Sequence, residues 1–424
     1  MNVINAVSET LGYIFDEKIP YAHALKRVQD AHPCGHEDLQ FIRSLTSCTL
    51  HHYLAIEDLL KRLDASFIAT KDMLYVYATI VSDLHFFRRL GIQRILLELN
   101  EIKANKDFAI SSEVESKILA IAESEDDFID NTDMDSPEYL SLKYNNPLWL
   151  TKMWIKHLGL EVTRRYLNAN THSVAQSLRV NPLVNTQSAI LNENPDFSAG
   201  PASDTLVYRH HERIQSHPLF VNHTIFQQRF ALSEVINALP IQRIRDCLIY
   251  EERPHAVYLD LSLRSKTEMK IDMAVPSDKR RYDVEGALKS WNLPNVHVFE
   301  SKANSLITAI RDEKDLVVVL PDCSKFDLIR TIPDFLYHFD QGALDNYIFS
   351  EATALREASA FVKPDGLLLY IINTCSNKEG HALIIEFLKN NVQFDLLSEK
   401  QYLPIDRFNS TLYYALLKRK DKEK

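Results

Sequence analysis

The chain has 424 residues, of which 46% are hydrophobic and 25% are charged, a composition typical of a globular protein with two or three domains. Its formal net charge is −10 at pH 7. This negative charge argues against a protein that coats nucleic acid non-specifically, because phosphate binding requires a basic surface, and it leaves room only for local basic patches.

The N-terminal sequence MNVINAVSETLGYIFDEK lacks the basic start and the small-residue cleavage site of a secretory signal. The sequence contains no run of about 18 uncharged apolar residues, the length that would span a bilayer. The five cysteines form no disulfide framework and are typical of a reducing compartment; they are Cys34, Cys48, Cys247, Cys323 and Cys375. We therefore expect a cytoplasmic protein with free thiols and no membrane partner.

Residues 1–122 have the pattern of an all-α bundle. Segments such as 39–63 and 73–90 place apolar residues three and four positions apart, with almost no proline inside. The polar and acidic segment 123–141 is predicted to be a linker. The cluster HPCGH at 32–36 has the residue types of a zinc site, but no second pair of ligands stands at metal-site spacing, so we expect no metal.

Residues 142–223 mix helical and extended patterns. The segment 145–159 is predicted to form a helix, with Pro147 near its first turn and Gly159 just past its end. A second helical pattern from residue 161 gives way to the extended segment SLRVN. This region is predicted to be a small α+β connecting domain.

Residues 224–424 alternate between strand and helix patterns, which indicates a Rossmann-like α/β domain with a parallel sheet. The predicted strands are 256–261, 269–273, 296–299, 316–320, 367–372 and 412–417, and the predicted helices are 282–291, 303–311, 347–361 and 382–390. Two of these strands end at a Cys-Ser pair, at Cys323 and at Cys375. Ligands of open α/β sheets bind outside the carboxyl ends of strands, so the two cysteines mark a candidate site.

Several short segments, in the same order, resemble those of a known family. They are NPLWLTKMW (146–154), LRVN (178–181), VLPDCS (319–324), VKPDG (362–366), TCS (374–376) and LYYAL (412–416). The sequence is similar to the bacterial ribosomal RNA cytosine-5 methyltransferases of the RsmB/Sun type. In that family a NusB-like RNA-binding helical domain precedes a methyltransferase core, and the resemblance covers nearly the whole chain.

The resemblance implies a reaction and a set of site residues. The thiolate of Cys375 would add to carbon 6 of cytosine, and carbon 5 would then take a methyl group from S-adenosylmethionine. Cys323 would assist release of the product. The resemblance also implies RNA contacts for Lys152, Arg179 and Asn181, although the last two have the alternative role of capping the connection between domains.

The sequence departs from the family at the cofactor loop, which reads roughly DxCAAPGGKT in the family. The matching place is predicted at LDLSLRSKT (259–267), where Asp260, Lys266 and Thr267 are candidate cofactor-binding residues but every glycine is gone. A side chain at such a position projects toward the ligand or strains the backbone. Asp272 is the candidate ribose-binding acid, and both aspartates have the alternative of being solvated carboxylates at strand ends. The short spacing from Thr267 to Asp272 further predicts that the first crossover helix is missing.

We therefore predict a protein that binds ribosomal RNA or another structured RNA and has lost or weakened methyl transfer. One alternative is an active S-adenosylmethionine-dependent cytosine-5 methyltransferase with Cys375 as its nucleophile. The other is a protein-interaction scaffold. S-adenosylmethionine is the expected cofactor if the protein is active, and no cofactor is expected otherwise.

Overall fold

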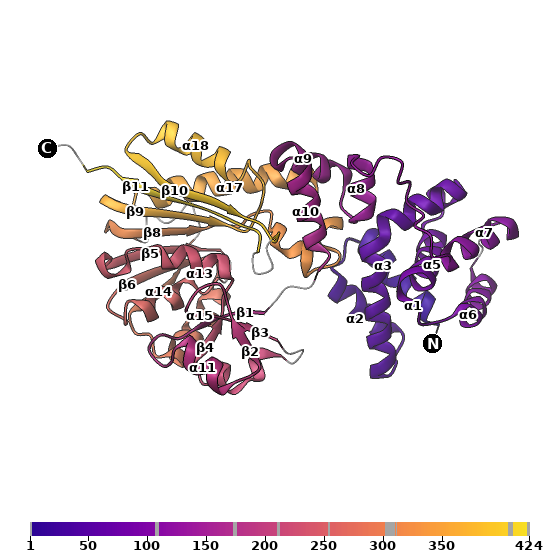
Figure 1. Ribbon diagram of the computed structural model, residues 1–424, viewed down its shortest axis with the longest axis horizontal. Coiled ribbons are helices and arrows are strands. Elements are labelled where there is room, and N and C mark those ends of the chain that lie inside the picture. Colours follow the sequence, from indigo (N-terminus) through magenta and orange to yellow (C-terminus); the bar gives the residue numbers. More distant parts are fainter. Residues whose placement is uncertain are drawn as a thin grey trace. The chain divides into compact units, whose positions relative to one another are not determined.

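The computed structural model describes residues 2–106, 110–172, 176–209, 213–252, 255–301, 310, 312–405 and 410–421. The chain divides into two compact units (Figure 1). The first comprises Met1–His172 and Ile329–Asp340, and the second comprises Ser173–Leu328 and Gln341–Lys424. The domain boundaries expected from the sequence, 1–122, 123–141, 142–223 and 224–424, stay a prediction.

The first unit is helical, as the apolar spacing predicted. Its helices are α1 (Val3–Phe15), α2 (Tyr21–Ala31), α3 (His36–Leu63), α4 (Ser66–Ala69), α5 (Lys71–Val81), α6 (Ile92–Asn105), α7 (Ser112–Glu123), α8 (Pro137–Lys143), α9 (Leu148–Leu158) and α10 (Leu160–Asn170), with a π-helical turn at Ser82–Phe87. Helix α5 is the centre of the bundle, because every residue from Met73 to Val81 is buried. A helix that is apolar all round can be stable only when other helices surround it.

The segment Ile329–Asp340 belongs to the helical unit although it follows that unit by more than 150 residues of sequence. The Tyr337 ring packs edge-on against Phe15, with ring centroids 4.9 Å apart, and its hydroxyl donates to the Leu50 carbonyl oxygen at 2.9 Å. The Asp334 carboxylate accepts the backbone amide of Tyr21 at 2.7 Å, at the first residue of α2. These contacts make the segment part of the bundle core.

The second unit begins with a four-stranded antiparallel sheet. Its order is β2 (Phe197–Ala199), β3 (Thr205–Tyr208), β1 (Gln176–Val180) and β4 (Ile225–Gln227). Two short helices, α11 (Gln187–Glu193) and α12 (Pro218–Val221), complete this part. Its core contains Leu178, Ile190, Leu206 and Ile225, all fully buried.

A seven-stranded sheet follows, and its order confirms the predicted Rossmann-like α/β fold. The order is β10 (Phe394–Tyr402), β11 (Leu412–Arg419), β9 (Val362–Ile372), β8 (Lys314–Leu320), β5 (Asp246–Glu251), β6 (Lys270–Val275) and β7 (Val296–Glu300). Strands β9, β8, β5, β6 and β7 are parallel to one another, and β11 is antiparallel to both of its neighbours. The strand order reverses between β5 and β8, so ligands are expected at the carboxyl ends of these strands.

Helices cover both faces of this sheet (Figure 1). Val318 of β8 faces a core shared with α13 (Phe230–Asn237), α14 (Val257–Arg264) and α15 (Asp278–Trp291). Val317 and Val319 face the opposite core, shared with α17 (Gln341–Ser359) and α18 (His381–Asn390). Burial on both faces explains why these strands are continuous apolar runs. Within the described residues, no helix combines the length and apolar character needed to cross a membrane.

The structure corrects the expected first strand and first crossover. The segment 256–261 is not a strand but the start of α14, and the first strand is β5, which was missed together with β10. The sequence YLDLSLR alternates apolar and polar residues as a strand does, but the polar Asp260 and Ser262 are themselves buried in the helix. The crossover helix predicted to be missing is therefore present as α14. The helix predicted at 303–311 lies outside the described residues except for residue 310.

Candidate functional site

The two cysteines lie at the carboxyl ends of neighbouring parallel strands. Cys323 follows β8 and Cys375 follows β9, and these strands pair in parallel register. Both side chains are buried, with 3% and 2% of their surface exposed. Both thiols therefore lie at one edge of the sheet, as the apolar runs that end at Cys-Ser predicted.

Acidic side chains surround Cys323. Burial raises the pKa of the Cys323 thiol well above its ordinary value, and Glu379, Glu351 and Asp327 raise it further, while the backbone amide of Asn373 opposes them. Burial also raises the pKa of Glu379 and, together with Glu379, that of Glu351. Reactive cysteines are found in electropositive, partly exposed surroundings. The environment of Cys323 has the opposite character and keeps the thiol protonated.

Hydrogen bonds fix Glu379 between the two Cys-Ser motifs. Its carboxylate accepts the backbone amide and the hydroxyl of Ser324, both at 2.7 Å, and the hydroxyl of Thr374 at 3.0 Å. The Ser324 and Thr374 hydroxyl oxygens also lie 2.7 Å apart. One buried carboxylate thus ties the loop after β8 to the loop after β9. Glu379 was not singled out from the sequence, because only the tertiary structure brings Ser324 to this carboxylate.

The loop that leaves β5 occupies the place where a cofactor loop is expected, at the switch point of the sheet. Its sequence from Glu251 to Ala256 is EERPHA and contains no glycine. Ala256 has a φ of 56°, in the left-handed region that favours glycine. The segment 259–267, predicted as the cofactor loop, instead lies in α14 and the turn after it, and the loop that follows β5 also lacks glycine.

An ion pair spans the carboxyl ends of β5 and β6. The Glu251 carboxylate, fully buried at the end of β5, lies 2.8 Å from the Arg280 guanidinium in the first turn of α15. Burial raises the pKa of Glu251 to about 7, and Arg280 opposes this rise. The His255 backbone amide also donates to this carboxylate at 3.3 Å, and the side-chain amide of Asn373 donates to the His255 ring at 2.8 Å. The chain's own polar groups thus connect the strand ends from β6 to β9.

Three of the residues predicted to bind the cofactor lie in or after α14. Asp260 is 1% exposed and faces Arg179, whose guanidinium Nε lies 3.0 Å from the carboxylate. Lys266 and Thr267 form the turn after α14, with φ angles of 52° and 62°. A crossover helix runs back from the carboxyl end of one strand to the amino end of the next. Lys266 and Thr267 therefore lie at the edge of the sheet opposite to the cysteines, which differs from their predicted role.

Asp272 also differs from its predicted position at a strand end. It is the third residue of β6, and its carboxylate lies 2.5 Å from the ammonium of Lys314, the first residue of β8. The two side chains are largely buried, with 13% and 3% of their surface exposed. This ion pair joins the amino halves of the strands, so neither a ribose contact nor the alternative of a solvated carboxylate describes Asp272.

The three residues predicted to contact RNA have different environments. Arg179 is 1% exposed, and besides Asp260 it contacts the carboxylate of Asp204 at 3.2 Å, so it supports the fold rather than a surface contact. Asn181 is also buried: its amide donates to the His223 carbonyl oxygen at 3.0 Å and accepts the Leu183 amide at 3.0 Å. These two residues differ from the predicted RNA contacts because internal partners occupy them.

Lys152 lies at the surface of α9, where its ammonium is 2.9 Å from the carboxylate of Glu138. Its side chain is 53% exposed, so it alone of the three predicted RNA contacts can reach a ligand without rearrangement of the core. Among the residues that the structure describes, no group of three or more His, Cys, Asp or Glu side chains is arranged to hold a metal ion.

Comparison with known proteins confirms the resemblance inferred from the sequence. The chain is 22% identical over 272 residues to "Probable ribosomal RNA small subunit methyltransferase B" of Bacillus subtilis (strain 168). The match covers 62% of this chain and 60% of that protein, so the chain spans less than two thirds of that relative's length in the match. No family model matches the chain.

Solved structures share the fold. The crystal structure of PH0851 has a TM-score of 0.72 at 18% identity and covers 99% of this chain and 98% of its own. A methyltransferase homolog protein from Pyrococcus horikoshii has a TM-score of 0.56 at 16% identity, covering 66% of this chain and 97% of its own. NSun6 from Pyrococcus horikoshii, determined with SFG, has a TM-score of 0.56 at 11% identity, covering 64% and 97%. These similarities confirm a methyltransferase-type fold.

Proposed function

We propose that this protein is an RNA-binding relative of the ribosomal RNA cytosine-5 methyltransferases that acts on or near ribosomal RNA without efficient methyl transfer. The proposal is supported by the similarity to a ribosomal RNA methyltransferase B and by the order of the seven strands. Its RNA partner, its cofactor chemistry and its cysteine chemistry all belong to this proposal.

One observation carries the proposed loss of methyl transfer. The ion pair of Glu251 and Arg280 lies at the carboxyl ends of β5 and β6, on the edge where a methyltransferase of this fold would hold S-adenosylmethionine. Binding of the cofactor there would have to displace a buried carboxylate from its partner, and separation of a buried pair typically costs about 3–5 kcal/mol. The left-handed Ala256 in the same loop also keeps a methyl group where a glycine would leave room.

The environment of Cys323 supports the same proposal. A group that assists product release by thiol chemistry needs access to its thiolate. Burial and the neighbouring Glu379 and Glu351 instead raise the pKa of Cys323. The role that the family resemblance implies for this residue is therefore disfavoured.

Calorimetry with S-adenosylmethionine and the purified full chain tests the proposal. We expect no saturable heat up to about 1 mM cofactor, a range that would detect an interaction of about −4 kcal/mol. Saturable binding in this range would overturn the proposed loss of cofactor binding. A variant with Glu251→Ala and Ala256→Gly removes the carboxylate and relaxes the loop, and any gain of binding in it would support the assigned obstruction.

RNA binding is tested separately, by titration of structured ribosomal RNA at increasing salt. The affinity is expected to fall as salt rises, because phosphate contacts release counterions. Lys152→Glu should weaken binding, whereas Lys389→Glu, at an exposed position of α18, serves as the matched control. Absence of binding at low salt would favour the interaction scaffold instead.

A second candidate function, an active cytosine-5 methyltransferase, is favoured by the two cysteines on adjacent strand ends. In that case Cys375 would be the nucleophile. Cys375→Ala should then abolish methylation of RNA, and Cys34→Ala, at a half-buried cysteine of the helical unit, should not. Retention of activity by Cys375→Ala would rule out this nucleophile.

A further inference from the structure

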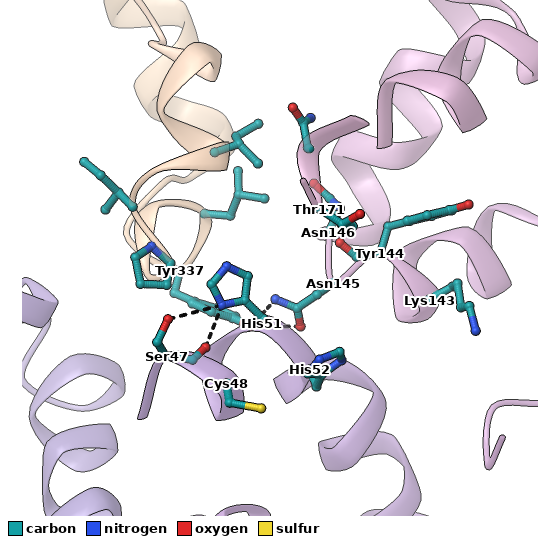
Figure 2. Close-up of a pocket in the computed structure, with 15 residues that line it drawn as sticks. Ser47, Cys48, His51, His52, Lys143, Tyr144, Asn145, Asn146, Thr171 and Tyr337 are labelled. Carbon is teal, nitrogen blue, oxygen red and sulfur yellow. Dashed lines mark hydrogen bonds between the residues drawn. The ribbon is translucent and has the colours of Figure 1, made fainter. Parts of the chain in front are cut away.

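The helical unit contains a cavity of about 360 Å³, several of whose polar groups bind the chain itself (Figure 2). Nδ1 of His51 donates to the Ser47 carbonyl oxygen at 2.6 Å, and the side-chain amide of Asn145 donates to the Leu50 carbonyl oxygen at 2.7 Å. These hydrogen bonds stabilise α3 and join it to the connection between α8 and α9. These polar groups thus serve the packing of their own unit, whereas a groove in the second unit is apolar and open.

This groove of about 450 Å³ lies between α17 and α18, which cover the same face of the seven-stranded sheet (Figure 1). Its floor is formed by the buried side chains of Leu355, Leu383 and Phe387. Phe349 and Ala352 line the groove from α17 and are exposed, Phe349 to 77% of its surface. The second unit therefore leaves an apolar surface uncovered along the joint between two helices.

The spacing of the lining residues gives the groove its direction. On α17 the lining residues Phe349, Ala352 and Arg356 stand three and four positions apart, and on α18 the lining residues Ala382 and Glu386 stand four positions apart. Residues at this spacing share one side of a helix, so both helices present a continuous side along the groove. A helix of a partner has the same spacing of side chains and can lay its apolar side into such a groove.

Charged groups stand on the rim of the groove, with a cation at each end. The ammonium of Lys378 lies 3.7 Å from the Asp345 carboxylate, and both side chains are more than half exposed, so this pair contributes little and the ammonium can take another partner. Arg356, in the last turn of α17, is eleven residues beyond Asp345, which is roughly 16 Å along the helix axis. The carboxylate of Glu386, in the middle of α18, is compensated by the ammonium of Lys389 at 3.6 Å.

We propose that the groove between α17 and α18 binds an amphipathic helix of a partner protein, with an acidic residue at each end of its apolar side. Two acidic residues eleven positions apart lie on the same side of a helix after about three turns, and they match the separation of the cations at Lys378 and Arg356. Apolar residues four and seven positions after the first acidic residue lie on that side as well and contact Phe349 and the apolar floor.

Charge also argues against a second copy of this chain as the occupant. Two grooves related by a two-fold axis lie either parallel or antiparallel to each other. In both arrangements a cationic end of one groove faces a cationic end of the other, at Lys378 or at Arg356. The partner is therefore a different protein, and this inference goes beyond the proposed function because it involves neither RNA nor the cofactor.

The test is fluorescence anisotropy with the full chain and a labelled peptide of about 18 residues, built on alanine and glutamine so that it is helical. The peptide carries two glutamates eleven positions apart, with leucines four and seven positions after the first. We expect saturable binding with a Kd below about 0.5 mM. Phe349→Ser should weaken binding about tenfold or more, because the exposed ring supplies apolar contact area without supporting the fold. Tyr282→Ser is the matched control, because Tyr282 is 64% exposed on α15, which covers the opposite face of the sheet.

A change of charge tests the match at the end of the groove. Arg356→Glu should weaken binding of the peptide, and one of two peptides with a single glutamate replaced by lysine should restore it, because opposite charges then meet again. A purely structural effect of Arg356→Glu would be rescued by neither peptide, and that result would overturn the charge match on which the proposal stands.

Two further outcomes would also overturn the proposal. One is the absence of saturable binding up to about 0.5 mM, or equal binding by Phe349→Ser and the unaltered chain. The other is a dimer of the unaltered chain, measured by analytical ultracentrifugation, that Phe349→Ser dissociates, because the groove then belongs to a second copy. Neither outcome bears on the proposed function, since binding of RNA and of S-adenosylmethionine is measured separately.

Discussion

Arg179→Met is the most informative change, because it removes one member of a buried ion pair and keeps the volume of the side chain. Arg179 and Asp260 are each 1% exposed, and their charged groups lie 3.0 Å apart between β1 and α14. Loss of one partner leaves the other charge buried without compensation. We expect the variant to lose about 3–5 kcal/mol of the free energy of unfolding of the second unit at pH 8.

The pH dependence follows from the carboxylate that remains. Burial raises the pKa of Asp260 from its ordinary value of 3.8 to about 6, and Arg179 opposes this rise. Because the pKa of Asp260 is higher in the folded than in the unfolded state, its carboxyl group stabilises the fold fully below pH 3.8, and this contribution is lost as pH rises through 6. Without Arg179 the pKa of Asp260 rises above 6, so the variant continues to lose free energy of unfolding as pH rises above 6. The gap between variant and unaltered chain should widen by up to about 1.4 kcal/mol for each pH unit above 6.

The assay is urea unfolding followed by circular dichroism and tryptophan fluorescence at pH 6, 7 and 8, with the two compact units allowed separate transitions. Arg245→Met is the matched control, because Arg245 is 66% exposed and its pair with Glu268 is also exposed. Exposed pairs contribute about 0–1 kcal/mol, so this control should change little. Adding Asp260→Asn to Arg179→Met should abolish the pH-dependent part of the loss in free energy of unfolding. A loss that is equal at pH 6 and pH 8 would refute the assigned role of the ion pair.

Three further predictions concern single residues. Cys323 should react with iodoacetamide much more slowly than Cys34 at pH 7.5, because burial and acidic neighbours raise the pKa of Cys323. Peptide mass spectrometry measures both alkylation rates, and faster alkylation of Cys323 would contradict this. Glu251→Gln should flatten the pH dependence of stability between about pH 4.5 and 7. Burial raises the pKa of Glu251 from 4.5 to about 7, so in the unaltered chain its contribution of up to about 3 kcal/mol is lost as pH rises through that window. Thermal unfolding of the variant with the same dependence of stability on pH as the unaltered chain would contradict this. Tyr337→Phe keeps the ring but removes the hydroxyl that donates to the Leu50 carbonyl oxygen at 2.9 Å. The Asn145 amide still donates to that oxygen at 2.7 Å, so the helical unit should lose only about 1 kcal/mol by urea unfolding, and an unchanged midpoint would show that the hydroxyl adds nothing.

Local patterns predicted much of the fold because they depend on residues close in sequence. The spacing of apolar residues predicted the helical unit, and continuous apolar runs bounded by turns predicted the strands that carry Cys323 and Cys375. The same reasoning failed at residues 256–261. There a period of two indicated a strand, whereas the segment forms α14, in which the polar Asp260 is buried and pairs with Arg179, a residue distant in sequence.

The residue types at two strand ends, the thiols of Cys323 and Cys375, were predicted from local sequence patterns. Their surroundings arise only when the chain folds. Folding brings Glu379 and Glu351 next to Cys323, aligns Arg280 with Glu251, and packs Tyr337 into a bundle that lies far away in sequence. Burial and the neighbouring charges set the chemistry of each group, and both arise from contacts between distant segments that no local pattern encodes.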